Sequence, residues 1–489
     1  MSVRTRFAPS PTGFLHVGGL RTALYNYLLA RQQSGQYLLR IEDTDRERLV
    51  PGAVEKLLEA FGRVNLLPDE GPRLVNGAVE QVGDVGPYIQ SERLPVYQEH
   101  AKRLLDAGAA YVCFCSSERL DGLRKQQEIA KLSTKYDRHC LSLPADEVLR
   151  RSAAGEAHVL RLRVPEGETS FEDVIRGTIT INNAEVDDQV LIKSDGFPTY
   201  HMAVVVDDHL MKITHVIRGE EWISSTPKHV ILYRLFGWDA PLFAHLPLLL
   251  NPDKSKLSKR QGDVAVEDYL AKGYLPEALV NFVALLGFNP KADQEIYAID
   301  ELIELFDLTK INKSGAVFDQ AKLNWMNGQY VMKKTSAELV ALVRPFLDAA
   351  GKTIDAALLE KICAIEKTRM ERLTDIVEIV DAYVSVPAFD PAILVWKKAD
   401  AADSKANLVG VRDHLSTVEE TVWTEIGLVE ASIKAYIESK GLSNGNVLWP
   451  TRVALSGRAA SPSPFELAWA LGKDETMRRL DGAIASLAT

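Results

Sequence analysis

The first 31 residues constrain the fold most, because they predict a strand, a loop and a helix in immediate succession. Polar and apolar residues alternate over residues 3–8, which is the pattern of a short strand. Pro9, Pro11 and Gly13 then exclude both helix and strand. After Gly19, apolar residues recur at helical spacing, at positions 20, 23, 24, 27 and 28. The loop therefore delivers residues 16–19 to a helix N-terminus.

A helix N-terminus is a natural binding site for phosphate. Its first N–H groups lack partners within the helix, and the helix dipole places positive potential there. Gly18 and Gly19 would let a ligand lie against the backbone, and His16 would add a ring donor. A tight turn in which His16 only caps the helix explains the same four residues, and they do not decide between the two interpretations.

The longer stretch resembles a known signature. His16-Val17-Gly18-Gly19 is similar to the "HIGH" motif of class I aminoacyl-tRNA synthetases, and residues 6–13 resemble its glutamyl/glutaminyl branch. The last motif position is Gly19 rather than His, a departure that bacterial glutamyl enzymes share. The resemblance implies a Rossmann-like catalytic domain in which His16, Gly18 and Gly19 bind ATP.

A second signature lies in the basic loop at residues 251–260. Four cations occur within seven residues there, a pattern that by charge alone favours a solvated loop. The run 256–260, Lys-Leu-Ser-Lys-Arg, is similar to the class I "KMSKS" motif, about 240 residues after the first motif. The resemblance implies that Lys256 and Lys259 act with His16 in catalysis, because lysines can neutralise charge that builds up on phosphate oxygens. Lys259 is also expected to contact ATP.

An amino-acid site is predicted where strands end. Residues 36–41 read as a buried strand that delivers Glu42 at its carboxyl end, where open α/β sheets bind ligands. Glu42 can hold an ammonium, and Arg6 can pair with a carboxylate. The acidic run 42–45 could also be a solvated turn or a magnesium site. The family resemblance favours glutamate binding by Arg6, Ala8, Ser10, Glu42, Tyr200 and Arg218, with Glu221 and Trp222 at the adenosine.

The remaining segments predict a mixed first half and a helical second half. Apolar runs at 190–192, 202–206 and 213–217 predict buried strands. Helices are expected over 53–61, over 91–107 with Ser91 as N-cap, and from Ser225 to Phe236. Residues 276–287 predict a helix that ends on Gly287. Long helical segments follow, which argues against a glutaminyl enzyme with its C-terminal β-barrels.

At the amino-acid site, Val204 stands where some relatives carry an Asn, so one side-chain hydrogen bond of those relatives is missing or replaced in this chain.

Three of the four cysteines cluster in sequence. Cys113 and Cys115 are followed 25 residues later by Cys140, a spacing that suggests a zinc knuckle. Relatives with such a knuckle carry a His where this chain has Ser142, which leaves Tyr136 and His139 as fourth-ligand candidates. Structural zinc is almost always four-coordinate, so zinc is possible here, but buried reduced thiols are the expectation and no metal site is predicted.

Composition is that of a globular protein, with 46% hydrophobic and 25% charged residues. No signal-peptide pattern and no run of about 18 apolar residues is present, so we expect a cytoplasmic protein without membrane contact. We also expect a monomer. A net charge of −10 argues against a general nucleic-acid binder. It allows docking of one RNA through local basic patches.

The predicted fold class is an α/β Rossmann-like class I catalytic domain with an α+β connective insertion, followed by an all-α C-terminal half. The resemblance implies ATP-dependent ligation of glutamate to tRNA(Glu) through a glutamyl-adenylate, with Mg²⁺ accompanying ATP. Two rivals remain, a small-molecule adenylyltransferase and a non-catalytic RNA-binding module. The predicted domains are the two catalytic halves at 1–110 and 191–255, the insertion receiving the tRNA acceptor end at 111–190, stem-contact helices at 256–327 and an anticodon-binding domain at 328–489.

Overall fold

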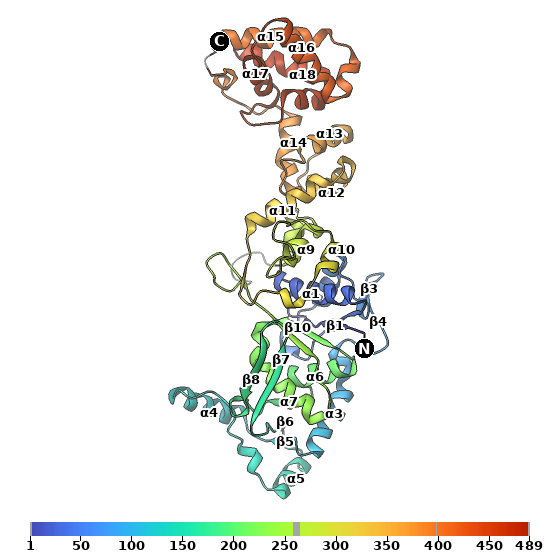
Figure 1. Ribbon diagram of the computed structural model, residues 1–489, viewed down its shortest axis with the longest axis vertical. Coiled ribbons are helices and arrows are strands. Elements are labelled where there is room, and N and C mark those ends of the chain that lie inside the picture. Colours follow the sequence, from blue (N-terminus) through green and yellow to red (C-terminus); the bar gives the residue numbers. More distant parts are fainter. Residues whose placement is uncertain (1, 258–264, 398, 488–489) are drawn as a thin grey trace. The chain divides into compact units, whose positions relative to one another are not determined.

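The computed structural model describes residues 2–257, 265–397 and 399–487 (Figure 1). Residues form two compact units, which are considered separately below. The first unit comprises Met1–Ala271 and Pro276–Gln320, and the second comprises Lys272–Leu275 and Ala321–Thr489. The predicted division into five domains is finer than these two units and stays a prediction.

A six-stranded sheet with the order β2-β1-β10-β11-β7-β8 is the framework of the first unit. Strands β2, β1, β10, β11 and β7 pair in parallel, and β8 is antiparallel to β7. The strands are β1 (Arg4–Phe7), β2 (Gln36–Leu39), β7 (Glu168–Asp173), β8 (Gly177–Asn182), β10 (His215–Gly219) and β11 (Leu242–Leu246). The strands predicted at 3–8, 36–41 and 213–217 are confirmed, within two residues at their ends.

The connections from the two central strands, β1 and β10, run toward opposite edges of the sheet. From β1 it passes through α1 (Val17–Gln32) to β2, and from β10 it passes through α7 (Thr226–Phe236) to β11 on the other side. Because parallel crossovers are right-handed, the two helices cover opposite faces of the sheet (Figure 1). The strand order therefore reverses between β1 and β10, and open α/β sheets bind ligands at such a switch point.

Each face of the sheet is covered by apolar packing. Helix α1 packs against β1, β2, β10, α9 (Pro276–Ala284) and α10 (Ile299–Leu305). On the other face, Val230 of α7 packs in one buried cluster with Leu38, Val216 and Phe243 of the sheet. Helices α3 (Leu94–Asp106) and α6 (Tyr200–Leu210) pack with α7 in a separate buried cluster, in which Met202 and Val206 are fully buried. Two further helices of this unit are α2 (Ala53–Arg63) and α8 (Val266–Ala271).

The region predicted as an insertion also contributes to the main sheet. Strands β5 (Ala110–Cys113), β6 (Val159–Leu162) and β9 (Val190–Ile192) form an antiparallel sheet of their own, joined by α4 (Ser117–Ile129) and α5 (Ala145–Ala153). In contrast, β7 extends the six-stranded sheet by pairing Asp173 with Phe243. This pairing carries Asp173 toward β10 and β11. Two small pairs complete the strands, β3 (Gly71–Val75) with β4 (Ala78–Val82) and β12 (Leu249–Leu250) with β13 (Ala316–Val317).

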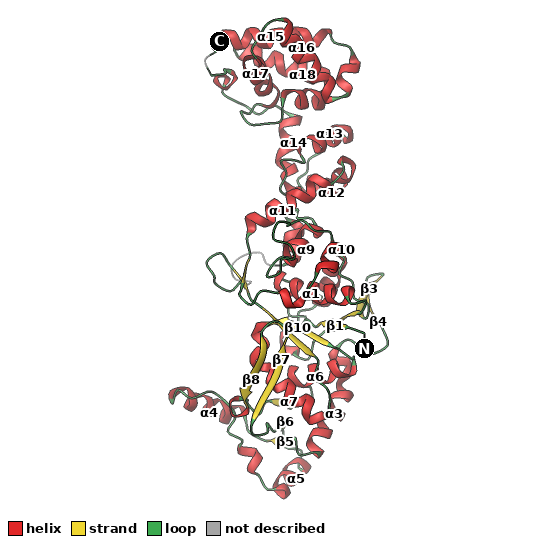
Figure 2. Ribbon diagram, viewed as in Figure 1, coloured by secondary structure: helices red, strands yellow, loops and turns green. Residues whose placement is uncertain are grey.

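The described residues of the second unit contain helices and no strand, as predicted (Figure 2). Ser463 caps the last helix by accepting from the backbone of Glu466, and Gly472 kinks that helix with a φ of 76°. The helices are α11 (Gln320–Lys333), α12 (Ser336–Ala349), α13 (Ala356–Glu366), α14 (Ile376–Val384), α15 (Ala401–Thr417), α16 (Ile426–Ser439), α17 (Asn444–Ser456) and α18 (Pro464–Ser486).

Three local predictions are wrong. Residues 202–206 form part of α6 rather than a strand, because a short run of apolar residues suits a helix buried on all sides as well as a buried strand. Ser91 is not the N-cap of α3, since a 3₁₀ turn over Gln90–Arg93 precedes that helix. Helix α9 ends at Ala284, three residues before Gly287. Among the described residues, no helix has the length and apolarity that a membrane span requires.

Candidate active site

His16 is the N-cap of α1, and its Nδ1 accepts the backbone N–H of Gly18 at 2.9 Å. The capping that the sequence allowed is therefore present. A neutral imidazole that accepts on Nδ1 carries its proton on Nε2, so capping is compatible with donation to a phosphate. An ideal Cβ on Gly18 would lie 2.6 Å from Cε1 of His16, so this ring position requires a glycine. Gly19 follows within the same first turn.

The described residues on each side of the lysine loop are held by backbone pairing. Lys256 pairs with Leu250, and the backbone N–H of Leu257 donates to Leu249 at 2.9 Å. On the other side of the loop, Ala265 forms a bridge with His16. The described ends of the loop therefore lie at β12 and at the start of α1. Ser258, Lys259 and Arg260 lie outside the described residues. The role of Lys259 therefore stays a prediction.

Four charged side chains are buried together: Arg6 lies in β1, Arg40 and Glu42 follow β2, and Asp208 lies in α6. Arg6 donates to both oxygens of Asp208, from Nε at 3.0 Å and from Nη2 at 3.1 Å. Arg40 donates to Asp208 at 2.7 Å and to Glu42 at 3.0 Å. Burial raises the pKa of Glu42 to about 7, against the opposing charges of Arg40 and Arg6. The sequence predicted that Arg6 can pair with a carboxylate. Asp208 is such a partner and occupies Nε and Nη2 of Arg6, while Nη1 bonds to no described residue.

Arg218 is the last residue but one of β10, on the other side of the switch point, and is 6% exposed. Its Nη1 donates to the hydroxyl of Tyr200 at 3.0 Å, and the ring of Tyr200 lies 4.3 Å from that of Trp222. Burial raises the pKa of Tyr200, and the charges of Arg218, Glu42, Arg6 and Asp208 act on this hydroxyl. The charged groups at β1, β2 and β10 therefore lie around the hydroxyl of Tyr200, at the switch point between β1 and β10.

The loop after β1 closes the same region. The backbone N–H of Glu42 donates to the carbonyl of Pro9 at 2.9 Å, which brings Glu42 against the segment of Ala8 and Ser10. Glu221 and Trp222 lie in a 3₁₀ turn, Glu220–Ser225, directly after β10. Most of the residues predicted to bind glutamate thus gather at one edge of the sheet, and Glu221 and Trp222 follow at the end of β10.

Several buried polar residues of this site were not identified from the sequence. Asp208 and Arg40 form its charged base. His229 and His245 contact Arg218, and Asp173 contacts His245. Two signals were available, an arginine inside the apolar run 38–41 and the acidic pair after the apolar run 202–206. Neither signal reveals its partner, because the partners are distant in sequence.

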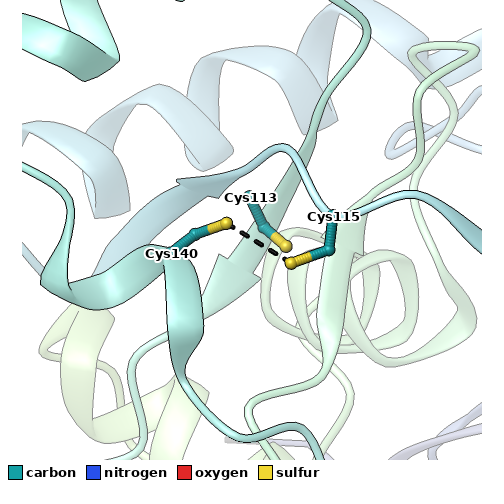
Figure 3. Close-up of side chains that lie close together, drawn as sticks. All are labelled: Cys113, Cys115 and Cys140. Carbon is teal, nitrogen blue, oxygen red and sulfur yellow. Dashed lines mark hydrogen bonds between the residues drawn. The ribbon is translucent and has the colours of Figure 1, made fainter. Parts of the chain in front are cut away.

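The three clustered thiols do converge (Figure 3). The sulfur atoms of Cys113, Cys115 and Cys140 all lie within 4.8 Å of one another, and among the described residues no histidine joins the group. The hydroxyl of Tyr136 lies 3.4 Å from Cys113 Sγ and 3.3 Å from Cys115 Sγ. Of the two candidates for a fourth metal ligand, Tyr136 lies beside the thiols, and His139 does not join the group. The expectation of reduced thiols stays a prediction, to be tested by metal analysis of the purified protein.

A cleft of about 880 Å³ opens in the second unit, between α13, α14, α17 and the segment before α18. Four arginines line it, together with Tyr383 and three carboxylates. Arg372 pairs with Asp375 at 3.4 Å, and Arg452 stacks over Trp449 with 4.6 Å from its Cζ to the ring centre. The arginines are Arg369, Arg372, Arg452 and Arg458. The cleft therefore combines cations with aromatic and polar surface.

Comparison with known proteins covers both units. Residues 2–325 match the family described as "tRNA synthetases class I (E and Q), catalytic domain", and residues 338–484 match "Anticodon binding domain". The glutamate--tRNA ligase of Alkaliphilus metalliredigens is 47% identical over 98% of both chains. That of Chloroherpeton thalassium is 46% identical over 99% of this chain and 98% of the relative.

A solved structure is similar in fold along the whole chain. The glutamate tRNA ligase of Elizabethkingia meningosepticum, solved in complex with its amino acid, superposes with a TM-score of 0.88. It is 36% identical and is covered completely, as is this chain. Sequence and fold agree over both units, so the chain belongs to the glutamate--tRNA ligases, a family of class I aminoacyl-tRNA synthetases.

Proposed function

We propose that the protein joins glutamate to the terminal ribose of tRNA(Glu) in two steps. The glutamate α-carboxylate attacks the α-phosphorus of ATP, which forms glutamyl-adenylate and releases pyrophosphate. A ribose hydroxyl of the tRNA then takes the glutamyl group and AMP leaves. The observation that carries this proposal is the buried Arg218 beside Tyr200 at the switch point, because its partners among the described residues include no carboxylate.

Glutamate is held by charge at both ends in this proposal. Arg218 receives the side-chain carboxylate, since a buried guanidinium favours an anionic partner. Glu42 receives the substrate ammonium, and that positive charge favours the ionised form of a carboxyl whose pKa burial has raised to about 7. The free edge of Arg6 serves the α-carboxylate. Ala8 and Ser10 bound the pocket from the loop after β1.

ATP binds across the start of α1, with Mg²⁺ on its phosphates. Gly18 and Gly19 let the phosphates approach the backbone, and Nε2 of His16 donates to a phosphate oxygen. Lys256 and Lys259 neutralise the charge that develops as pyrophosphate leaves. Glu221 and Trp222 contact the adenosine. No protein nucleophile takes part, so the rate enhancement comes from positioning and electrostatics.

The cleft of the second unit is proposed to receive bases of the anticodon loop. Its residues lie within the segment that matches an anticodon binding domain. Single-stranded RNA is commonly held by stacking on aromatic or guanidinium planes and by cationic contacts, and this cleft offers both. Local cations of this kind reconcile RNA binding with a net charge of −10.

Removing Arg369 and Arg458 together, by substitution with alanine, should weaken tRNA binding about 10- to 100-fold, as the loss of two RNA contacts predicts. The KM values for glutamate and ATP should stay within about twofold, since the cleft belongs to the other unit. Joint replacement of Arg412 and Arg478 by alanine is the matched control, because these two arginines pair with Asp481 and Glu475 and do not line the cleft. An equal loss of affinity in the control would show that only overall charge matters.

The activity itself is tested by ATP–pyrophosphate exchange and by tRNA charging with purified components. Exchange should require glutamate, and charging should require tRNA(Glu). A small-molecule adenylyltransferase would show exchange but no charging, and a non-catalytic RNA-binding module would show neither. Charging assays with tRNA(Gln) in place of tRNA(Glu) would establish whether the enzyme discriminates between them.

A further inference from the structure

The buried guanidinium of Arg218 is held by neutral groups. Its Nε donates to Nε2 of His245 at 3.1 Å, and its Nη1 donates to Nδ1 of His229 at 3.3 Å. Its Nη2 donates to the hydroxyl of Thr226 at 2.8 Å. His229 is 2% exposed, and His245 and Thr226 are fully buried. Three nitrogens are thus held in place without any described carboxylate in direct contact.

His245 is neutral because Nε of Arg218 can only donate, so that Nε2 of His245 accepts. The second partner of His245 fixes the position of its proton. Its Nδ1 lies 2.6 Å from Oδ2 of Asp173, and the backbone N–H of His245 donates to the same oxygen at 3.1 Å. Burial acts to raise the pKa of Asp173, but the hydrogen bond to His245 and two backbone N–H groups outweigh it and lower the pKa. Asp173 is therefore an acceptor, His245 donates from Nδ1, and its Nε2 is left to accept from Arg218.

His229 is neutral for a different reason. Arginine can only donate, so Nδ1 of His229 accepts and Nε2 carries the proton. That Nε2 lies 2.9 Å from Nδ1 of His201, which accepts in turn. Burial lowers the pKa of His229, and the charge of Arg218 lowers it further, as do His201, Arg6 and His245. Burial and these neighbouring groups all oppose the protonation of His229.

We propose that His229 and His245 are positioning residues that determine the preference for glutamate. They accept the N–H groups of Arg218 and fix its orientation, yet being neutral they leave its charge for the substrate carboxylate. A carboxylate at position 229 would pair with Arg218 itself, and glutamate would then lose its advantage over the neutral amide of glutamine. This inference rests on the proposed glutamate site at Arg218.

The test compares His229→Asn with His229→Asp, two side chains of nearly equal size that differ in charge. Asn offers an amide oxygen close to the position of Nδ1, so its glutamate KM should stay within about threefold of the unsubstituted protein. Asp should raise the glutamate KM about 10- to 100-fold with the ATP KM unchanged. Inhibition by glutamine should stay the same or strengthen, so the ratio of glutamine to glutamate affinity rises.

His229→Leu adds a variant that removes the acceptor without adding charge. It should raise the glutamate KM about 5- to 50-fold, because a buried N–H of Arg218 loses its partner. Thermal unfolding is recorded for all three variants, and if the leucine variant does not fold, the Asn and Asp pair decides alone. Equal effects of Asn and Asp, or parallel rises in the ATP and glutamate KM, would overturn the proposal.

Arg218→Gln separates this inference from the proposed function. If that substitution leaves the glutamate KM unchanged, the glutamate site itself is misplaced and the proposal about His229 falls with it. If it raises the glutamate KM as expected while His229→Asp does not, only the positioning role is refuted.

Discussion

Arg218→Gln should raise the KM for glutamate about 100-fold or more, while the KM for ATP changes less than about threefold. The physical reason is the loss of a buried positive charge that no described carboxylate contacts, so that the substrate carboxylate is left in a buried pocket without its counter-charge. The glutamine side chain at position 218 can still form hydrogen bonds, but it carries no charge. The measurement is steady-state ATP–pyrophosphate exchange at varied glutamate and at varied ATP.

Arg234→Gln is the control for that experiment. This exposed arginine of α7 donates to the carbonyl of Ser170 at 3.2 Å and touches none of the proposed substrate-binding groups. Its kinetics should match those of the unsubstituted protein. If Arg218→Gln weakens ATP binding instead of glutamate binding, Arg218 belongs to the nucleotide site and the proposed division of the pocket is wrong.

Substitution of His16 or Lys259 by alanine should slow adenylate formation by roughly one to three powers of ten, the range seen when a donor to a transition state is lost. Glutamate binding should change little, because both residues are proposed to act on phosphate. Single-turnover measurement of adenylate formation separates this chemical step from product release. Equal loss of glutamate binding with an unchanged chemical step would show that the roles are misassigned.

His16→Asn separates catalysis from helix capping. Asparagine is a good N-cap residue, so this variant should keep the start of α1 and the thermal stability of the protein. It lacks a donor at the position of Nε2, and its rate should therefore fall as far as that of His16→Ala. If His16→Asn were fully active, the hydrogen bond to Gly18 would be the whole contribution of His16.

The sequence alone predicted the elements whose pattern is local. The strand and loop before α1, the strand that delivers Glu42 and the helix of residues 226–236 follow from periodicity and from Pro and Gly positions. The helical second unit was predictable for the same reason. Where the local pattern suits two structures, as at residues 202–206, prediction failed, because burial on all sides removes the polar face that identifies a helix.

The two signatures were also readable without a structure, since each is a contiguous run of residues. What the sequence did not contain is their surroundings. Arg6 and Asp208 are separated by 202 residues, and the carboxylate of Asp208 accepts from Nε and Nη2 of Arg6, which leaves only Nη1 for a substrate. A charged residue that is identified from the sequence therefore does not define a binding site by itself. The free energy with which it binds a substrate depends on which other charges folding brings within contact distance.

Residue identities determined that this chain has an arginine beyond a buried strand, with a tyrosine and two phosphate motifs elsewhere in the sequence. Only the tertiary structure decided that Arg218 is held by neutral acceptors. Asp173 reaches His245 across 72 residues, because β7 joins the sheet beside β11. The pKa of each histidine depends on burial and on neighbouring charges, which are properties of the packed sheet and its helices rather than of any segment of the chain.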